Sequence, residues 1–268
     1  NKKNLLIIQS RIQHYRVPFF DNLKKKLKDD YCLLVTGGGK NDTSTGNLKR
    51  NYFHSIKFIK VGIIHLWIGL FPIISKFNPD IIITTASPRN LSILILYLYC
   101  KLLNIRIIGW SKVYSDNAEN KLSFFKIKFY QLFDEIITYG YSSKKLLLEN
   151  NFKKKIHVAF NTIDTDIGSD KNKKIKLEKI KQLIKKKYQL KNKKIFLFIG
   201  RMHKEKNPLD MFFLKNILKK EKNYVVFFVG SGPIDNILKD KIKENDCHNF
   251  YYVGKVPYLY DYAWDKFI

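Results

Sequence analysis

Short apolar runs alternate with longer stretches of helical periodicity along the first 165 residues. The runs are bounded by turn residues and predict strands over 5–9, 31–36, 55–61, 81–85, 105–110, 135–139 and 156–160. Helical periodicity predicts helices over 17–27, 63–77, 90–103, 122–133 and 142–151. Strands that alternate with helices are joined as parallel neighbours by right-handed crossovers. We therefore expect a doubly wound α/β domain over residues 1–168.

A lysine-rich segment interrupts this rhythm. Residues 170–194 contain twelve Lys but only Asp170 and Glu178 as acids, and apolar residues recur there at helical spacing. We interpret residues 169–193 as an amphipathic basic linker helix. Beyond it, strand patterns at 194–199, 224–229 and 250–253 alternate with helical patterns at 208–220 and 233–245, which predicts a second α/β domain over 194–268.

The second domain has only three clear strands, so we expect it to be cut short. The first residue, Asn1, is not Met, which also suggests a fragment. Two such domains would form a cleft that faces the carboxyl ends of their strands, where open α/β sheets bind ligands. Candidate chemistry is therefore sought in the turns that follow strands.

Charge adds a second consideration, because 50 Lys and Arg outnumber 23 Asp and Glu and give a formal net charge of +27. Such an excess is typical of proteins that meet nucleic acid, acidic lipid or phosphorylated substrates. Compositional drift is an alternative, since Lys, Asn and Ile are over-used along the whole chain. A nucleic-acid partner is not expected.

Several classes of protein are disfavoured by the sequence. The longest apolar stretch, 61–75, includes His65 and Pro72 and is too short to span a membrane, so we interpret it as a buried or interfacial helix. The amino-terminal residues have no signal-peptide pattern. Three scattered cysteines favour a reducing cytosol, and we predict a cytoplasmic protein. HExxH, GxSxG and a complete phosphate-loop motif are all missing, and we expect no metal.

The turn Gly200–Asn207, GRMHKEKN, is the most informative motif. It follows an apolar strand and precedes a helix that Pro208 opens, so Arg201 and Lys206 would lie near a helix amino terminus that favours an anion. A diphosphate would fit there. The alternative is that both are solvated loop cations in a basic protein.

The next strand ends in the turn Gly230-Ser231-Gly232-Pro233. Two glycines allow the backbone to turn tightly and to approach a ligand closely, and Pro233 suits a first helical position. A purely structural turn explains the same residues.

Taken together, these motifs resemble the retaining nucleotide-sugar glycosyltransferases of the GT-B fold, family 4 (group 1). GRMHKEKN matches the family's GRxxxxKN-like turn, VGSGP its VGxGP strand end, and NTID at 161–164 the turn that closes its first domain. ITYGYSSKKLLLENNF is similar to the strand and helix that precede that turn. YDYAWDKFI at 260–268 resembles the segment before the family's acidic donor-binding motif.

The resemblance implies specific roles for these residues. Arg201 and Lys206 would grip the donor's diphosphate and stabilise charge on the departing nucleotide, without a metal or other cofactor. Gly200, Gly230, Gly232 and Pro233 would line the donor pocket.

The chain also departs from the family. The acidic pair that holds the donor sugar would follow Asp265, beyond the last residue, so the chain as given is expected to be inactive. The first turn reads QSRIQHYRVPFF and has no glycine, which matches relatives with an HYR-type opening and suggests His14 and Arg16 for the acceptor side. Arg89, in the turn after 81–85, is a further acceptor-side candidate. The alternatives are that His14 is a structural histidine and that Arg89 lies in a turn that only starts a helix.

We predict a cytoplasmic glycosyltransferase that transfers a sugar, with retention, from a nucleotide diphosphate to a saccharide or lipid-linked acceptor in bacterial surface polysaccharide synthesis. Its basic surface and apolar 63–74 helix would suit peripheral contact with an anionic inner membrane face. The alternative is a catalytically incomplete fragment that only binds a ligand or a partner.

Overall fold

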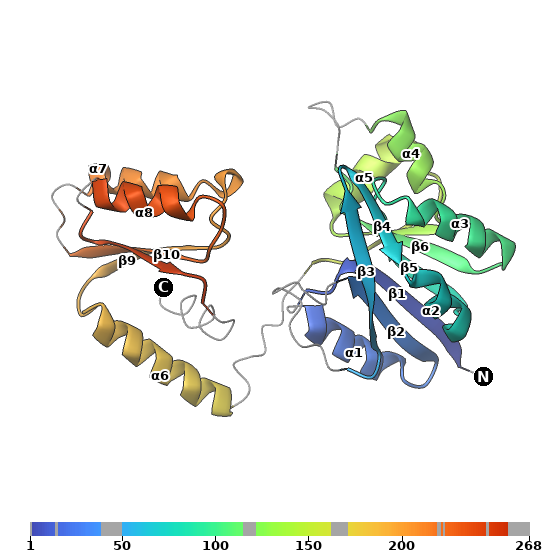
Figure 1. Cartoon of the computed structure of the whole chain (residues 1–268), viewed down its shortest axis with the longest axis horizontal. Helices are drawn as coiled ribbons and strands as arrows, with labels where there is room; N and C mark the ends of the chain where they lie inside the picture. The colour runs from blue at the N-terminus through green and yellow to red at the C-terminus, as the bar shows by residue number, and fades with distance from the viewer. Residues whose placement is uncertain are drawn as a thin grey trace. The chain divides into compact units, whose positions relative to one another are not determined.

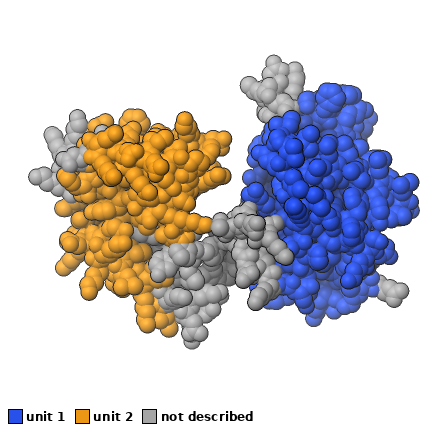
Figure 2. All heavy atoms as spheres, viewed as in Figure 1, with its two compact units in different colours: residues 1–164 blue, residues 165–268 orange. Residues whose placement is uncertain are grey.

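The computed structural model describes residues 2–13, 16–38, 50–114, 122–161, 171–218, 221, 223–244 and 247–256. The chain divides into two compact units, Asn1–Asp164 and Thr165–Ile268 (Figure 2). Each unit is an α/β structure built on its own sheet.

The sheet of the first unit has the order β4-β3-β2-β1-β5-β6-β7-β8. Neighbouring strands are parallel except for the antiparallel pair of β3 and β4. This order, which starts at a central β1 and proceeds outward in both directions, is that of a doubly wound sheet. The strands are β1 (Lys3–Arg11), β2 (Tyr31–Gly38), β3 (Phe53–Val61), β4 (Ile64–Ile68), β5 (Ile81–Thr85), β6 (Arg106–Ser111), β7 (Glu135–Thr138) and β8 (Lys155–Val158).

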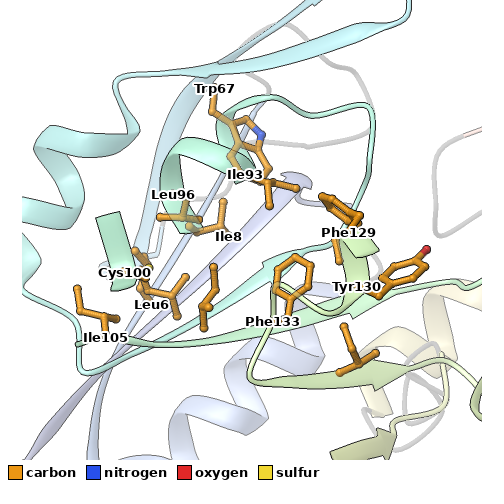
Figure 3. Close-up of a cluster of buried hydrophobic side chains, with 14 of the residues drawn as sticks. Leu6, Ile8, Trp67, Ile93, Leu96, Cys100, Ile105, Phe129, Tyr130 and Phe133 are labelled. Carbon is orange, nitrogen blue, oxygen red and sulfur yellow. The ribbon is translucent and has the colours of Figure 1, made fainter. Parts of the chain in front are cut away.

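Helices cover both faces of this sheet (Figure 1). On β1, Leu6 and Ile8 join one apolar cluster and Leu5 and Ile7 join the other, because successive side chains of a strand point to opposite faces. Phe20 of α1 packs in the second cluster, while the first takes residues from the other four helices. Figure 3 shows part of the first cluster, with Ile93 and Leu96 of α3 and Phe129 of α4. The helices are α1 (Val17–Leu27), α2 (Leu70–Phe77), α3 (Ser92–Leu102), α4 (Phe124–Tyr130) and α5 (Tyr141–Glu149).

The helix predicted over 63–77 is wrong in its first half, where the chain forms β4 instead. Gly62, with φ of 58°, allows a tight turn that folds β4 back along β3. Gly69, with φ of 82°, separates β4 from α2. An apolar run has no period that distinguishes a strand from a helix, so the two glycines and the pairing with β3 decide the outcome.

The second unit has a parallel sheet of order β11-β10-β9 among its described residues. Its strands are β9 (Lys194–Ile199), β10 (Tyr224–Val229) and β11 (Phe250–Gly254). All six residues of the central β10 are buried, which explains why its sequence, YVVFFV, is continuously apolar.

The predicted basic linker contains the helix α6 (Lys171–Lys187), which belongs to the second unit. Ile180 and Ile184 pack with Val225 and Phe227, so α6 covers one face of the sheet. α7 (Phe213–Ile217) and α8 (Asp235–Glu244) cover the other face (Figure 1). The segment is therefore a structural layer of this unit.

The helix predicted over 208–220 is shorter and tighter than expected. The 3-10 helix η4 (Pro208–Phe212) precedes α7. Phe212 stacks on Phe228 and Phe250, with ring centroids 5.7 and 5.2 Å apart, which fixes this turn against the sheet. In the described part of the chain, every helix is too short or too polar to cross a bilayer.

Candidate functional site

Two loops meet at the carboxyl edge of the second sheet. Gly200–Asn207 follows β9 and the turn from Gly230 follows β10. The register pairs Val229 with both Ile199 and Gly254, so all three strands end side by side. The sequence-predicted donor residues are thus brought together on one edge of this unit.

Backbone hydrogen bonds join the two loops directly. The Gly200 N–H donates to the Val229 carbonyl at 3.0 Å, and the Met202 N–H donates to the Ser231 carbonyl at 3.3 Å. Met202 is fully buried, which anchors the first loop by its side chain as well. The backbone on both sides of Arg201 is therefore held in place before any ligand binds.

Both glycines of the second loop are required by this close approach. A methyl group at Gly230 would lie 1.9 Å from the Gly200 carbonyl oxygen, and one at Gly232 would lie 2.2 Å from the Met202 carbonyl oxygen. Gly230 also has a φ of 128°, which side chains disfavour. The structural explanation left open from sequence holds for both positions, and their role as pocket lining stays a prediction.

Arg201 and Lys206 are exposed on the first loop. Lys206 ends the 3-10 turn η3 (Lys204–Lys206), and Asn207 follows with a φ of 48°. Within the described part of the chain, neither cation has a hydrogen bond or an ion pair from its side chain, whereas Lys194 on the same unit pairs with Glu221 at 2.6 Å. An anion can therefore reach both groups without displacing a carboxylate.

The start of α8 is occupied by its own acid. The Gly232 N–H donates to Asp235 Oδ1 at 2.9 Å, which is a typical use of a first-turn acid. Burial and a hydrogen bond to the same carboxylate raise the pKa of Tyr252 to about 12. A negative ligand would be repelled by Asp235, which leaves Arg201 and Lys206 as the candidate anion-binding groups of this edge.

At the carboxyl edge of the first sheet, Arg16 links β1 to the segments that follow β7 and β8. Its guanidinium donates to Gln9 Oε1 at 2.8 Å, to the Tyr139 hydroxyl at 2.6 Å and to Asn161 Oδ1 at 3.4 Å. It also lies over the rings of Trp110 and Tyr139, 5.3 and 5.4 Å from their centroids. Arg16 is thus a fixed part of this edge, and its predicted acceptor contact would come through the groups that it positions.

Aromatic residues surround Arg16, and sequence reasoning missed them. Trp110 and Tyr139 stack at 5.9 Å, Phe19 contacts Trp110 at 5.9 Å, and Lys112 Nζ lies 5.8 Å from the Tyr139 ring. The sequence pattern that could have identified them is an aromatic residue at or just after the end of a predicted strand. Such rings suit the faces of sugars, and Lys112 supplies an exposed positive charge.

The other acceptor-side candidates are placed differently. Arg89 is exposed in the turn before α3, and its carbonyl accepts the His65 N–H at 2.8 Å. In the same turn Asn90 Oδ1 accepts the Ser92 N–H at 3.1 Å, so the segment does start a helix, as the alternative held. His14, residues 162–164 of the NTID turn and the 260–268 segment lie outside the described residues.

Metal ligation and cysteine chemistry add little at either edge. The described residues contain no group of three or more His, Cys, Asp or Glu side chains that could hold a metal ion. Cys32, Cys100 and Cys247 are all free, and burial raises the pKa of Cys100 to about 12.

Comparison with known proteins supplies further information. No protein-family model matches the chain. It is 25% identical over 199 residues to the uncharacterized glycosyltransferase MJ1059 of Methanocaldococcus jannaschii, a match that covers 68% of this chain and 47% of the relative. The match thus spans about half the length of that curated relative.

Solved structures match almost the whole chain. Alr3699/HepE of Anabaena, in complex with UDP, has a TM-score of 0.61 at 12% identity, over 97% of this chain and 70% of that one. UDP-GlcNAc 2-epimerase of Neisseria meningitidis, bound to UDP-GlcNAc, has a TM-score of 0.63 at 16% identity, over 97% and 74%. The chain has the GT-B fold. At these identities the likeness establishes the fold alone, and GT-B proteins of different activities share it.

Proposed function

We propose that the chain belongs to a glycosyltransferase that uses a nucleotide-diphosphate sugar as donor. The observation that carries this proposal is a pair of exposed cations, Arg201 and Lys206, which have no side-chain partner among the described residues. They lie on a loop held by backbone hydrogen bonds at the carboxyl edge of the second sheet. The similarity to MJ1059 and the UDP complex of the Anabaena protein support the same assignment.

The proposed chemistry follows from these charges. The bond between the anomeric carbon and the diphosphate oxygen breaks, and the acceptor hydroxyl oxygen takes its place on the same face, with retention. The hydroxyl proton leaves with the nucleoside diphosphate. Arg201, with a planar fork of donors, and Lys206, with a mobile point charge, stabilise the negative charge that grows on the leaving group. No metal is required for this role.

The acceptor side is proposed at the carboxyl edge of the first sheet. The exposed Phe19 offers a ring face to a saccharide, Lys112 offers a charge to a phosphate, and Arg16 positions the Tyr139 hydroxyl. A lipid-linked saccharide acceptor in bacterial surface polysaccharide synthesis would use both the ring contact and the charge. We place the protein in the cytoplasm, where its net charge of +27 favours peripheral contact with an anionic membrane face.

The direct test is calorimetric titration of the chain with UDP, GDP and uridine. We expect a diphosphate to bind at least tenfold more tightly than uridine, because charge-assisted hydrogen bonds contribute about 1.5–3 kcal/mol each. Equal affinity for UDP and uridine would exclude a diphosphate site.

A second assay separates transfer from epimerisation, since GT-B neighbours include UDP-GlcNAc 2-epimerases. The protein is incubated with a UDP-sugar and candidate acceptors. A transferase releases UDP in proportion to product, whereas an epimerase changes the sugar and keeps it on UDP. Binding of UDP without either reaction would favour the ligand-binding alternative.

A further inference from the structure

The outer face of α3 is apolar although it faces solvent. Leu91, Leu94, Ile95, Leu98 and Leu102 recur at the i, i+3, i+4, i+7, i+11 spacing of one helical stripe, and all five are exposed, Leu98 to 61% and Leu102 to 85%. We call these five residues the α3 stripe. The opposite side of the helix places Ile93, Leu96 and Cys100 in the core. A helix that is apolar on both sides ordinarily has a second partner.

The hairpin of β3 and β4 extends this surface. The His65 N–H donates to the Arg89 carbonyl and the Leu91 N–H donates to the His65 carbonyl, at 2.8 and 3.1 Å, so residues 89–91 pair along the free edge of β4. Since His65 and Asn90 are bridge partners and share one face, Ile64 and Leu91 share the other. Ile64 and Ile68 are exposed there, next to the start of the α3 stripe.

Basic residues border the surface, and the acid that contacts α3 from outside residues 50–105, Asp134, is already paired with Lys101 at 2.8 Å. Lys57 pairs in register with Ile68, Arg89 precedes the α3 stripe, and both are exposed. Between residues 50 and 105 the only acid is Asp80, and its carboxylate already accepts the Asn4 N–H at 2.7 Å. The surface therefore combines an apolar centre with a positive margin.

We propose that the α3 stripe, with the adjoining β4 edge, is the surface by which this protein docks on an anionic lipid bilayer. This specifies the membrane contact proposed above and moves it from the 63–74 segment to α3; it does not depend on nucleotide binding. A bilayer takes leucine side chains into its acyl region and Lys and Arg against its headgroups. A two-fold contact with a second copy would instead place the same cations opposite one another, without acids to pair them.

Co-sedimentation of the chain with lipid vesicles tests the proposal. We expect binding to vesicles of phosphatidylcholine mixed with phosphatidylglycerol, and much weaker binding to phosphatidylcholine alone. The double variant Leu98→Gln, Leu102→Gln should weaken binding at least tenfold, since moving even one leucine side chain from water into the acyl region strengthens binding by about tenfold. Leu148→Gln on α5 is the matched control, because Leu148 is also an exposed helical leucine, at 54%, and lies outside the surface. It should bind like the wild type.

Lys57→Gln provides a second variant that leaves the apolar residues intact, and it should weaken binding to the anionic vesicles about fivefold. Unchanged binding of the double variant, equal loss in Leu148→Gln, or no vesicle binding by the wild type would overturn the proposal. Sedimentation velocity is a further check. A dimer that forms in the wild type and is lost in the double variant would overturn the proposal and assign the surface to a second copy. UDP titration of the same samples reports separately on the donor site.

Discussion

Gly230 occupies the point where the loops after β9 and β10 touch, and a single methyl group there should separate them. In Gly230→Ala the new carbon would lie 1.9 Å from the Gly200 carbonyl oxygen, while ordinary contact begins at 3.4 Å, so the backbones must part by about 1.5 Å. That displacement breaks the hydrogen bond from the Gly200 N–H to the Val229 carbonyl. It also strains the hydrogen bond from the Met202 N–H to the Ser231 carbonyl. Each costs about 1 kcal/mol, and a φ of 128° costs about 1–3 kcal/mol for a side chain.

The predicted loss of stability is therefore about 3–5 kcal/mol in the second unit. For a unit of this size, each kcal/mol lowers Tm by roughly 4–8 °C, so scanning calorimetry should find a fall of more than about 10 °C. UDP affinity should fall with it, because a displacement of about 1 Å is enough to disorganise a binding loop.

Gly69→Ala is the matched control for backbone strain. Gly69 also has a positive φ, 82°, but an added methyl group would meet nothing within 4 Å. We expect only the strain term, about 1–3 kcal/mol, and no change in UDP affinity. Hydrogen exchange of peptides covering β10 and α2 assigns each transition to its unit. The reasoning fails if Gly230→Ala is no less stable than Gly69→Ala relative to wild type.

Two further predictions concern the first unit. Arg16→Met removes the donors to Gln9 Oε1 and the Tyr139 hydroxyl, and Gln9 is buried, so urea denaturation should register a loss of about 1–3 kcal/mol; a loss below about 0.5 kcal/mol would contradict its positioning role. Burial of Asp134 favours its neutral form, but hydrogen bonds from Lys101 and a backbone N–H hold its pKa below the ordinary 3.8. The ionised Asp134 carboxylate therefore stabilises the folded state fully at neutral pH. This stabilisation is lost as the pH falls from about 5 through the folded pKa. The midpoint of urea denaturation should therefore fall more steeply with acid in wild type than in Asp134→Asn, and parallel curves would refute this linkage.

Most of the fold was predictable because the central strands of a parallel sheet are buried on both faces. Such strands appear as continuous apolar runs, as in β10, and their alternation with helices predicts that they run parallel. The β3–β4 hairpin was not predictable from periodicity, since it lies within one apolar run and depends on Gly62 and on pairing with β3. The same limit applied to α6, whose packing on the second sheet depends on distant residues such as Phe227.

The candidate site was predictable in its position and less so in its internal contacts. Loops after parallel strands are expected at the carboxyl edge, which placed Arg201 and Lys206 correctly beside the turn from Gly230. The contact between Gly230 and the Gly200 carbonyl, thirty residues away in sequence, follows only from the register of β9 and β10. The partners of Arg16 are more distant still in sequence, since Tyr139 lies 123 residues after Arg16.

The central claim is that Arg201 and Lys206 bind the diphosphate of a nucleotide, and the UDP affinities of three variants test it most directly. Calorimetry should find that Arg201→Met and Lys206→Met each weaken UDP binding about tenfold or more. Lys204→Met is the control, because Lys204 is an exposed cation of the same 3-10 turn, and it should change the affinity by no more than about twofold. UDP affinities that are equal in all three variants and in wild type would contradict the account.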